Sequence, residues 1–137
     1  MSQRDDLLYL VHIKETIRLI EQTAGDRGKE AFLADADIRD ATLYRLQTLA
    51  ESTQRLSQEL KARHVAVPWA DIAGFRNRVV HAYLGVDLEI VWDIVGHSLS
   101  DLRRCVELEL LRRAKARPGP AKEKDGPEID TGLGIGF

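Results

Sequence analysis

The chain has 137 residues, of which 44% are hydrophobic and 31% are charged, and its formal net charge is −2. This length fits one domain. The slightly acidic net charge means that the electrostatic field of the whole protein does not favour nucleic-acid binding, so any RNA site must be a local basic patch. No apolar run approaches the roughly 18–20 residues that span a bilayer, and the N-terminus lacks the pattern of a signal peptide, so cytoplasm is the expected location. Cys105 is the single cysteine, which excludes an internal disulfide, and its apolar helical surroundings predict a small core residue.

The first helix is predicted over about residues 3–24, with Ser2 and Asp5 as an N-terminal cap and Gly25 as the stop. Its apolar positions step by three and four and form one stripe, which is Leu10, Ile13, Ile17, Ile20 and Ala24. After a turn at residues 26–28, a short helix is expected over residues 29–34.

Asp35 and Asp37 are candidate caps for a second long helix over about residues 38–63. Its stripe again has three-four spacing and is Thr42, Leu46, Leu49, Thr53, Leu56 and Leu60. Residues 65–67 then indicate an extended connector, because the residue before a proline is pushed out of helical geometry.

A third helix is predicted to begin at Pro68, where the missing N–H costs nothing, and to end at Gly85. Its stripe is Trp69, Ile72, Phe75, Val79 and Tyr83. Asp87 is the expected cap of a fourth helix, whose stripe is Leu88, Val91, Val95, Leu99, Leu102, Val106 and Leu110.

From residue 114 onward the chain is rich in proline, glycine, lysine, glutamate and aspartate and has little apolar content, which predicts a disordered tail. No strand pattern of period two occurs before it. The sequence therefore predicts an all-α fold, an up-and-down bundle of four main helices over residues 1–113, followed by a disordered C-terminal tail over residues 114–137.

Residues 75–83, FRNRVVHAY, gather the side chains that can do chemistry. The guanidinium of Arg76 can hold a phosphate through two hydrogen bonds, and His81 can exchange a proton near neutral pH. Such a pair can cleave an RNA phosphodiester without a metal. The spacing alone is weak evidence, because 14 arginines and four histidines in 137 positions give about 0.4 such pairs by chance.

Helical geometry limits what one copy can do with these groups. His81 lies five residues after Arg76, roughly 140° around a helix axis, whereas Tyr83 nearly shares a face with Arg76. Either the helix is irregular near His81, or two copies meet at a symmetric interface and build a shared site. We favour the second arrangement and expect a homodimer.

In that arrangement the candidate catalytic residues are His81, as the proton-transfer group for a ribose 2′-hydroxyl or the leaving 5′-oxygen, and Arg76, as the phosphate-holding group. The substrate must be RNA, because DNA lacks the attacking hydroxyl. Asn77 could orient either group, Arg78 could contact a flanking phosphate, and Tyr83 could stack a base or position the phosphate.

Structural explanations exist for the same residues. His81 could be an ordinary structural histidine, Arg76 the partner of an acidic residue on a neighbouring helix, and Tyr83 the end of the core stripe. No metal site is expected, because the other histidines and Cys105 do not have zinc-ligand spacing, and no cofactor is expected. The competing functional class is a non-catalytic helical interaction module.

The signature segment of HepT-like proteins, in the HEPN superfamily, resembles residues 67–83 of this chain, which read VPWADIAGFRNRVVHAY. The signature has a proline-tryptophan pair, an arginine-asparagine pair, and then a histidine and a tyrosine, and it matches Arg76, Asn77, His81 and Tyr83 here. Residues 84–87 and the helical segment 40–51 are also similar to the family. The likeness covers about residues 4–113.

This resemblance implies a helical homodimer in which two motifs face each other in a cleft and act as a metal-independent endoribonuclease. Members of the family are typically toxins of type II toxin–antitoxin systems, encoded with a minimal nucleotidyltransferase antitoxin. In some systems that partner transfers AMP to the motif tyrosine, which corresponds to Tyr83. The resemblance therefore implies a nucleotidyltransferase as the partner. It also leaves room for a non-catalytic module that binds such a partner, since HEPN domains can lose activity.

Overall fold

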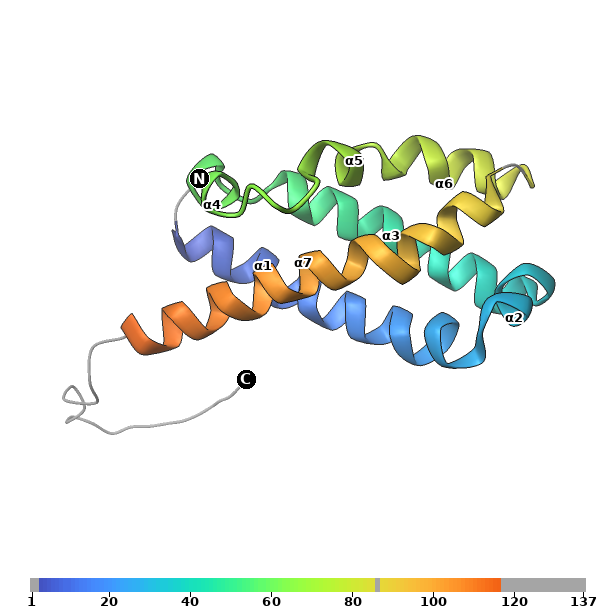
Figure 1. Cartoon of the computed structure of the whole chain (residues 1–137), viewed down its shortest axis with the longest axis horizontal. Helices are drawn as coiled ribbons and strands as arrows, with labels where there is room; N and C mark the ends of the chain where they lie inside the picture. Colours follow the sequence, from blue (N-terminus) through green and yellow to red (C-terminus); the bar gives the residue numbers. More distant parts are fainter. Residues whose placement is uncertain (1–2, 86, 117–137) are drawn as a thin grey trace.

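The computed structural model describes residues 3–85 and 87–116, and every regular element among them is a helix. Four helical rods run back and forth along the molecule (Figure 1): α1 (Gln3–Ile20), α3 (Ala36–Gln54), the pair α5 (Trp69–Ala73) and α6 (Phe75–Tyr83), and α7 (Leu88–Ala116). Helix α1 packs against α3 and α7, and α6 packs against the same two helices, which closes the bundle. The predicted all-α bundle of four main helices is confirmed.

The first rod matches the prediction except in its last turn. Helix α1 continues into a wider π-helical turn, η1 (Glu21–Gly25), in which the Asp26 N–H donates to the Glu21 and Thr23 carbonyls. All five predicted stripe residues of this rod are buried in the core. The predicted Ser2 cap lies outside the described residues. The short helix expected next is α2 (Lys29–Ala34), with Phe32 buried.

The predicted continuous helix over residues 38–63 is wrong, because the chain breaks after α3 and resumes as α4 (Gln58–Arg63). The break is fixed by Ser57, whose hydroxyl accepts a hydrogen bond from the Leu60 N–H (3.2 Å) and caps α4. The carboxylate of Asp6 on α1 accepts from both the backbone N–H (2.8 Å) and the hydroxyl (2.6 Å) of Ser57. The predicted stripe is nevertheless fully buried. Asp35 is confirmed as the cap of α3, accepting from two backbone N–H groups of its first turn.

The third rod also has an interruption that the sequence pattern did not predict. Instead of one helix over residues 68–85, α5 ends at Ala73 and α6 begins at Phe75, with Gly74 between them. Pro68 is the N-cap of α5 and not its first helical residue. Because the break precedes Arg76, the candidate site residues from Arg76 to Tyr83 lie on one regular helix.

The last rod, α7, continues three residues past the expected end at Arg113. Residues 117–137, and with them the rest of the predicted tail, lie outside the described residues. The predicted stripe of α7 faces the core, and Cys105 is buried as predicted. Burial raises the pKa of the Cys105 thiol to about 12, and the nearby Glu109 adds to this effect. Within residues 3–85 and 87–116, none of the helices has the length and apolar content needed to cross a membrane.

One buried carboxylate connects α4 to α7 near the C-terminal end of α7. Glu109, 2% exposed, accepts hydrogen bonds from Arg63 (2.9 and 3.2 Å), from Arg113 (2.6 Å) and from His64 Nε2 (2.5 Å). We call these four residues the Glu109 cluster. Burial alone would raise the pKa of Glu109, but the hydrogen bonds from Arg63, His64 and Arg113 outweigh burial and lower the pKa to about 2.

Candidate functional site

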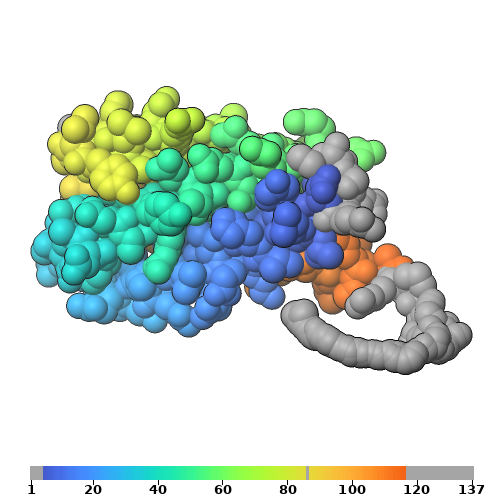
Figure 2. Space-filling view, turned by 180° about the vertical axis from the view of Figure 1, so that it is seen from behind, coloured from blue at the N-terminus to red at the C-terminus, as the bar shows by residue number. Residues whose placement is uncertain are grey.

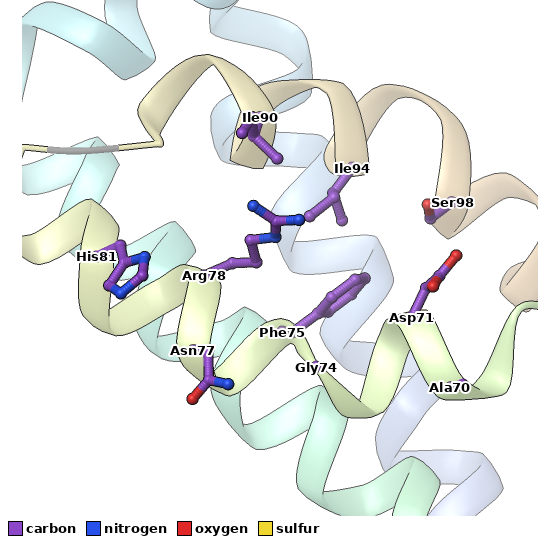
Figure 3. Close-up of a pocket in the computed structure, with 10 residues that line it drawn as sticks. All are labelled: Ala70, Asp71, Gly74, Phe75, Asn77, Arg78, His81, Ile90, Ile94 and Ser98. Atoms are coloured by element: carbon purple, nitrogen blue, oxygen red, sulfur yellow. The ribbon is translucent and has the colours of Figure 1, made fainter.

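A cleft of about 500 Å³ separates α5 and α6 from α7 (Figure 3), a volume within the range of roughly 300–1,000 Å³ that small-ligand sites occupy. Most of its polar side chains come from α5 and α6, namely Asp71, Asn77, Arg78 and His81, and Ser98 comes from α7. Its apolar side chains are Phe75 from α6 and Ile90 and Ile94 from α7. Figure 3 shows Arg78 extending from α6 toward the two isoleucines.

Only part of the motif, by which we mean residues 75–83, lines the cleft. Asn77, Arg78 and His81 line it, whereas Arg76 and Tyr83 do not. Arg78 and His81 are three residues apart on α6, so they share a face, and Arg76 lies roughly 140° away from His81 on a regular helix. One copy of the chain therefore does not bring Arg76 and His81 to the same point.

His81 has a carboxylate partner that the sequence reading missed. Its Nδ1 lies 3.1 Å from Oδ2 of Asp87, and the same oxygen lies 3.6 Å from Nη1 of Arg78. When Nδ1 carries the proton it donates to Asp87, which leaves Nε2 free to accept a proton from a substrate. The His81 side chain is 56% exposed and the Asp87 side chain 18%, so the imidazole is accessible while its partner is held in place.

The backbone around the turn between α6 and α7 explains why Asp87 can reach α6. Gly85 and Asp87 both have positive φ, 82° and 67°, and aspartate is among the few non-glycine residues that enter this region readily. The Asp87 carbonyl accepts from the Val91 N–H at the start of α7, the position expected of an N-cap. Its side chain, predicted only as a helix cap, contacts the histidine of the motif instead. A signal did exist in the sequence, because an acidic residue follows the histidine closely across a glycine turn.

Arg76 is exposed on α6. Among residues 3–85 and 87–116, its guanidinium has no salt bridge and no side-chain hydrogen bond. The alternative that Arg76 pairs with an acidic residue of a neighbouring helix is therefore wrong for the described part of the chain. Its five donors are available to an anion from outside the protomer.

Tyr83 is 51% exposed, so it is not the buried end of the core stripe, which ends on α6 with Val79 and Ala82. Its pKa is raised from the ordinary value, first by partial burial and then by the negative charge of Asp40 on α3. Figure 2 shows that α3 lies between α1 and α6 on the face seen from behind, so α6 is open to solvent on the α3 side of the molecule as well. The phenol itself is accessible to solvent.

The described residues include no cluster of three or more His, Cys, Asp or Glu side chains able to hold a metal ion. The cleft itself is lined by an imidazole, a carboxylate and a guanidinium. Together these groups can transfer a proton and attract a phosphate.

Comparisons with known proteins agree with this chemistry. Residues 13–108 match the protein family described as Ribonuclease HepT-like. A protein of Thermococcus cleftensis named "Probable ribonuclease HepT" is 32% identical over 95 residues, which cover 69% of this chain and 86% of that protein.

Two further relatives differ in length. A Methanocaldococcus jannaschii protein, named as a gamma-glutamylcyclotransferase and candidate RNase, is 30% identical over 101 residues, 74% of this chain but 46% of that longer protein. A candidate RNase of Caldanaerobacter subterraneus is 29% identical over 107 residues, 78% of this chain and 95% of that protein. The chain thus spans about half of the first relative and most of the other two. No solved structure matches the chain significantly.

Proposed function

This chain belongs to the HepT-like ribonuclease family, and from that premise we propose that it is a metal-independent endoribonuclease that acts as the toxin of a toxin–antitoxin pair. The observation that carries the proposal is the accessible His81 imidazole, oriented by Asp87, at the edge of an open cleft. Here one nitrogen faces a carboxylate and the side chain is more than half exposed.

His81 acts as the general base in this mechanism. Its Nε2 takes the proton of a ribose 2′-hydroxyl, the 2′-oxygen forms a bond to the adjacent phosphorus, and the bond from phosphorus to the 5′-oxygen breaks. The leaving 5′-oxygen takes up a proton, so the products are a 2′,3′-cyclic phosphate and a 5′-hydroxyl. Asp87 stabilises the imidazolium that forms between the two proton transfers.

Arg76 supplies the positive charge that the pentacoordinate phosphate needs in the transition state. Because Arg76 and His81 point to different sides of α6, a second copy of the chain contributes one of the two groups to each site. Arg78, already 3.6 Å from Asp87, contacts a flanking phosphate, and Asn77 orients the substrate at the mouth of the cleft. The exposed Val80 on the outer side of α6 gives a second copy an apolar surface to pack on.

A nucleotidyltransferase antitoxin is the partner that controls this activity. Tyr83, half exposed and close to the negative charge of Asp40, is accessible to such an enzyme. An AMP group on its oxygen would add bulk and a phosphate charge beside the place where Arg76 receives the substrate phosphate. Mass spectrometry after co-expression with an adjacent nucleotidyltransferase tests this step, since an unmodified Tyr83 in a neutralised complex would contradict it.

The activity is tested with purified protein and single-stranded RNA in excess EDTA. The wild type should cut the RNA and leave a 2′,3′-cyclic phosphate, and His81→Ala and Arg76→Ala should each lose cleavage while keeping their helical circular dichroism. His97→Ala is the matched control, because His97 is an exposed histidine of α7 outside the cleft. Cleavage that persists in both motif variants, or that requires a divalent ion, would refute the proposal. Tight binding of a nucleotidyltransferase without any cleavage would favour the interaction module.

A further inference from the structure

The cleft has a second polar end that the proposed reaction does not use. Asp71 on α5 and Ser98 on α7 line it, and Figure 3 shows both at the end of the cleft away from His81. Within residues 3–85 and 87–116, neither side chain has a salt bridge or a side-chain hydrogen bond. Two polar groups that line an open cleft without protein partners indicate a site where a ligand can bind and be recognised.

The space between the two polar ends is apolar. Ile90 and Ile94 form the α7 wall, and the buried ring of Phe75 lies beneath. Ile90 is 40% exposed, although its position on α7 faces the cleft. A flat, largely apolar group inserted here would cover this exposed aliphatic surface, which is favourable in water.

The length of the cleft fits one nucleotide. Asp71 and Arg78 are seven residues apart on two nearly continuous helices, which corresponds to about 10 Å at 1.5 Å per residue. A nucleotide whose phosphate lies beside His81 would place its base over the isoleucines and the edge of the base at Asp71. The volume of about 500 Å³ accommodates a ligand of this size.

We propose that Asp71, assisted by Ser98, selects guanine as the base beside the phosphate held at His81, an inference that rests on the proposed ribonuclease function. An ionised carboxylate only accepts hydrogen bonds, so it selects a base edge that presents neighbouring donors. Guanine alone presents two adjacent N–H groups, N1–H and N2–H, on its Watson–Crick edge, and its O6 can accept from the Ser98 hydroxyl. Adenine and cytosine each offer one amino group next to a ring-nitrogen acceptor that would face the carboxylate lone pairs, and uracil offers a single N–H between two carbonyls.

The first test measures binding, so that it does not depend on cleavage. Guanosine 3′-monophosphate and adenosine 3′-monophosphate are titrated into isotope-labelled full-length protein, and amide chemical shifts of α5, α6 and the first half of α7 are followed. We expect the guanine nucleotide to bind at least about tenfold more tightly, the size of effect typical of a bidentate base contact. Asp71→Asn should remove this preference, because an amide presents a donor to the guanine donors. Ser98→Ala should weaken it.

Asp93→Asn is the matched control, since Asp93 is an exposed carboxylate of α7 that does not line the cleft, and it should bind like the wild type. Equal binding of both nucleotides by the wild type, or an unchanged preference in Asp71→Asn, would overturn the inference. The second test maps cleavage of a mixed-sequence RNA, in which cuts should lie beside guanosine in the wild type and be redistributed among the bases in Asp71→Asn. A guanine preference in binding without any RNA cleavage would refute the proposed function and leave the base assignment standing. Cleavage without a base preference would support the proposed function and refute the base assignment.

Discussion

The Glu109 cluster permits a quantitative prediction about stability and pH. Glu109 has an ordinary pKa of 4.5 and a folded-state pKa of about 2, because hydrogen bonds from Arg63, His64 and Arg113 outweigh its burial. At 1.36 kcal/mol per pH unit, the difference corresponds to about 3 kcal/mol of folding stability. Since the folded state has the lower pKa, this contribution is fully present above about pH 5 and is lost as the pH falls toward 2.

The substitution Glu109→Gln removes the charge and keeps the shape. At pH 7 the variant should lose about 3 kcal/mol or more of unfolding free energy, because Arg113 and His64, whose side chains are each 17% exposed, would keep buried donors without their anion. The loss should shrink as the pH falls toward 3, because unfolding of the wild type is then coupled to proton uptake at Glu109, which the variant lacks. The variant should therefore have the flatter pH profile.

Urea unfolding followed by circular dichroism at pH 7, 5, 4 and 3, at one fixed protein concentration, measures both effects. Glu107→Gln is the control, because Glu107 is an exposed carboxylate on the same helix, and its pH profile should match that of the wild type. If the free energies of unfolding of the wild type and Glu109→Gln differed by the same amount at every pH, the cluster would stabilise the fold through shape and not through charge. That result would refute the reasoning.

Three further predictions follow from the described contacts. Asp87→Asn should lower the single-turnover cleavage rate by about 10²-fold or more with little change in RNA affinity, because the amide no longer stabilises the His81 imidazolium; an equal loss in affinity would indicate a structural role instead. Cys105, with a pKa raised to about 12, should not react with a thiol reagent at pH 8 in the native protein and should react fully in urea, so rapid native labelling would contradict its burial. Light scattering at micromolar concentration should give about twice the 15.4 kDa chain mass, and a monomer with full activity would exclude a shared site.

The sequence was sufficient to predict the helical rods, since hydrophobic spacing is a local signal. The stripe of the second rod illustrates this, because Thr42 and Thr53 are as buried as its leucines and each hydroxyl donates to a carbonyl of its own helix. The break at Ser57 could not be predicted in the same way. It depends on Asp6, which lies 51 residues away in the chain and meets Ser57 only in the folded bundle.

The candidate site was predictable in part for the same reason. His81 and its neighbours lie on one helix, so their angular relation followed from their spacing, and the regular α6 keeps it. The pairing of His81 with Asp87 required knowledge of the turn that reverses the chain, and Ser98 could be placed opposite Asp71 only by packing two helices together. Contacts within a helix are encoded locally, whereas contacts between helices depend on the whole fold.

The division of the motif between two sides of α6 leads to a sharp test of the shared site. If each site takes Arg76 from one copy and His81 from the other, neither Arg76→Ala nor His81→Ala alone can assemble an intact pair. A dimer of one variant with the other assembles one intact site and one site that lacks both groups. Since equal co-expression makes half of all dimers mixed, the mixture should recover about a quarter of the wild-type cleavage rate. If Arg76 and His81 of the same copy worked together, the mixed dimers would be as inactive as the separate variants, and the shared site would have to be abandoned.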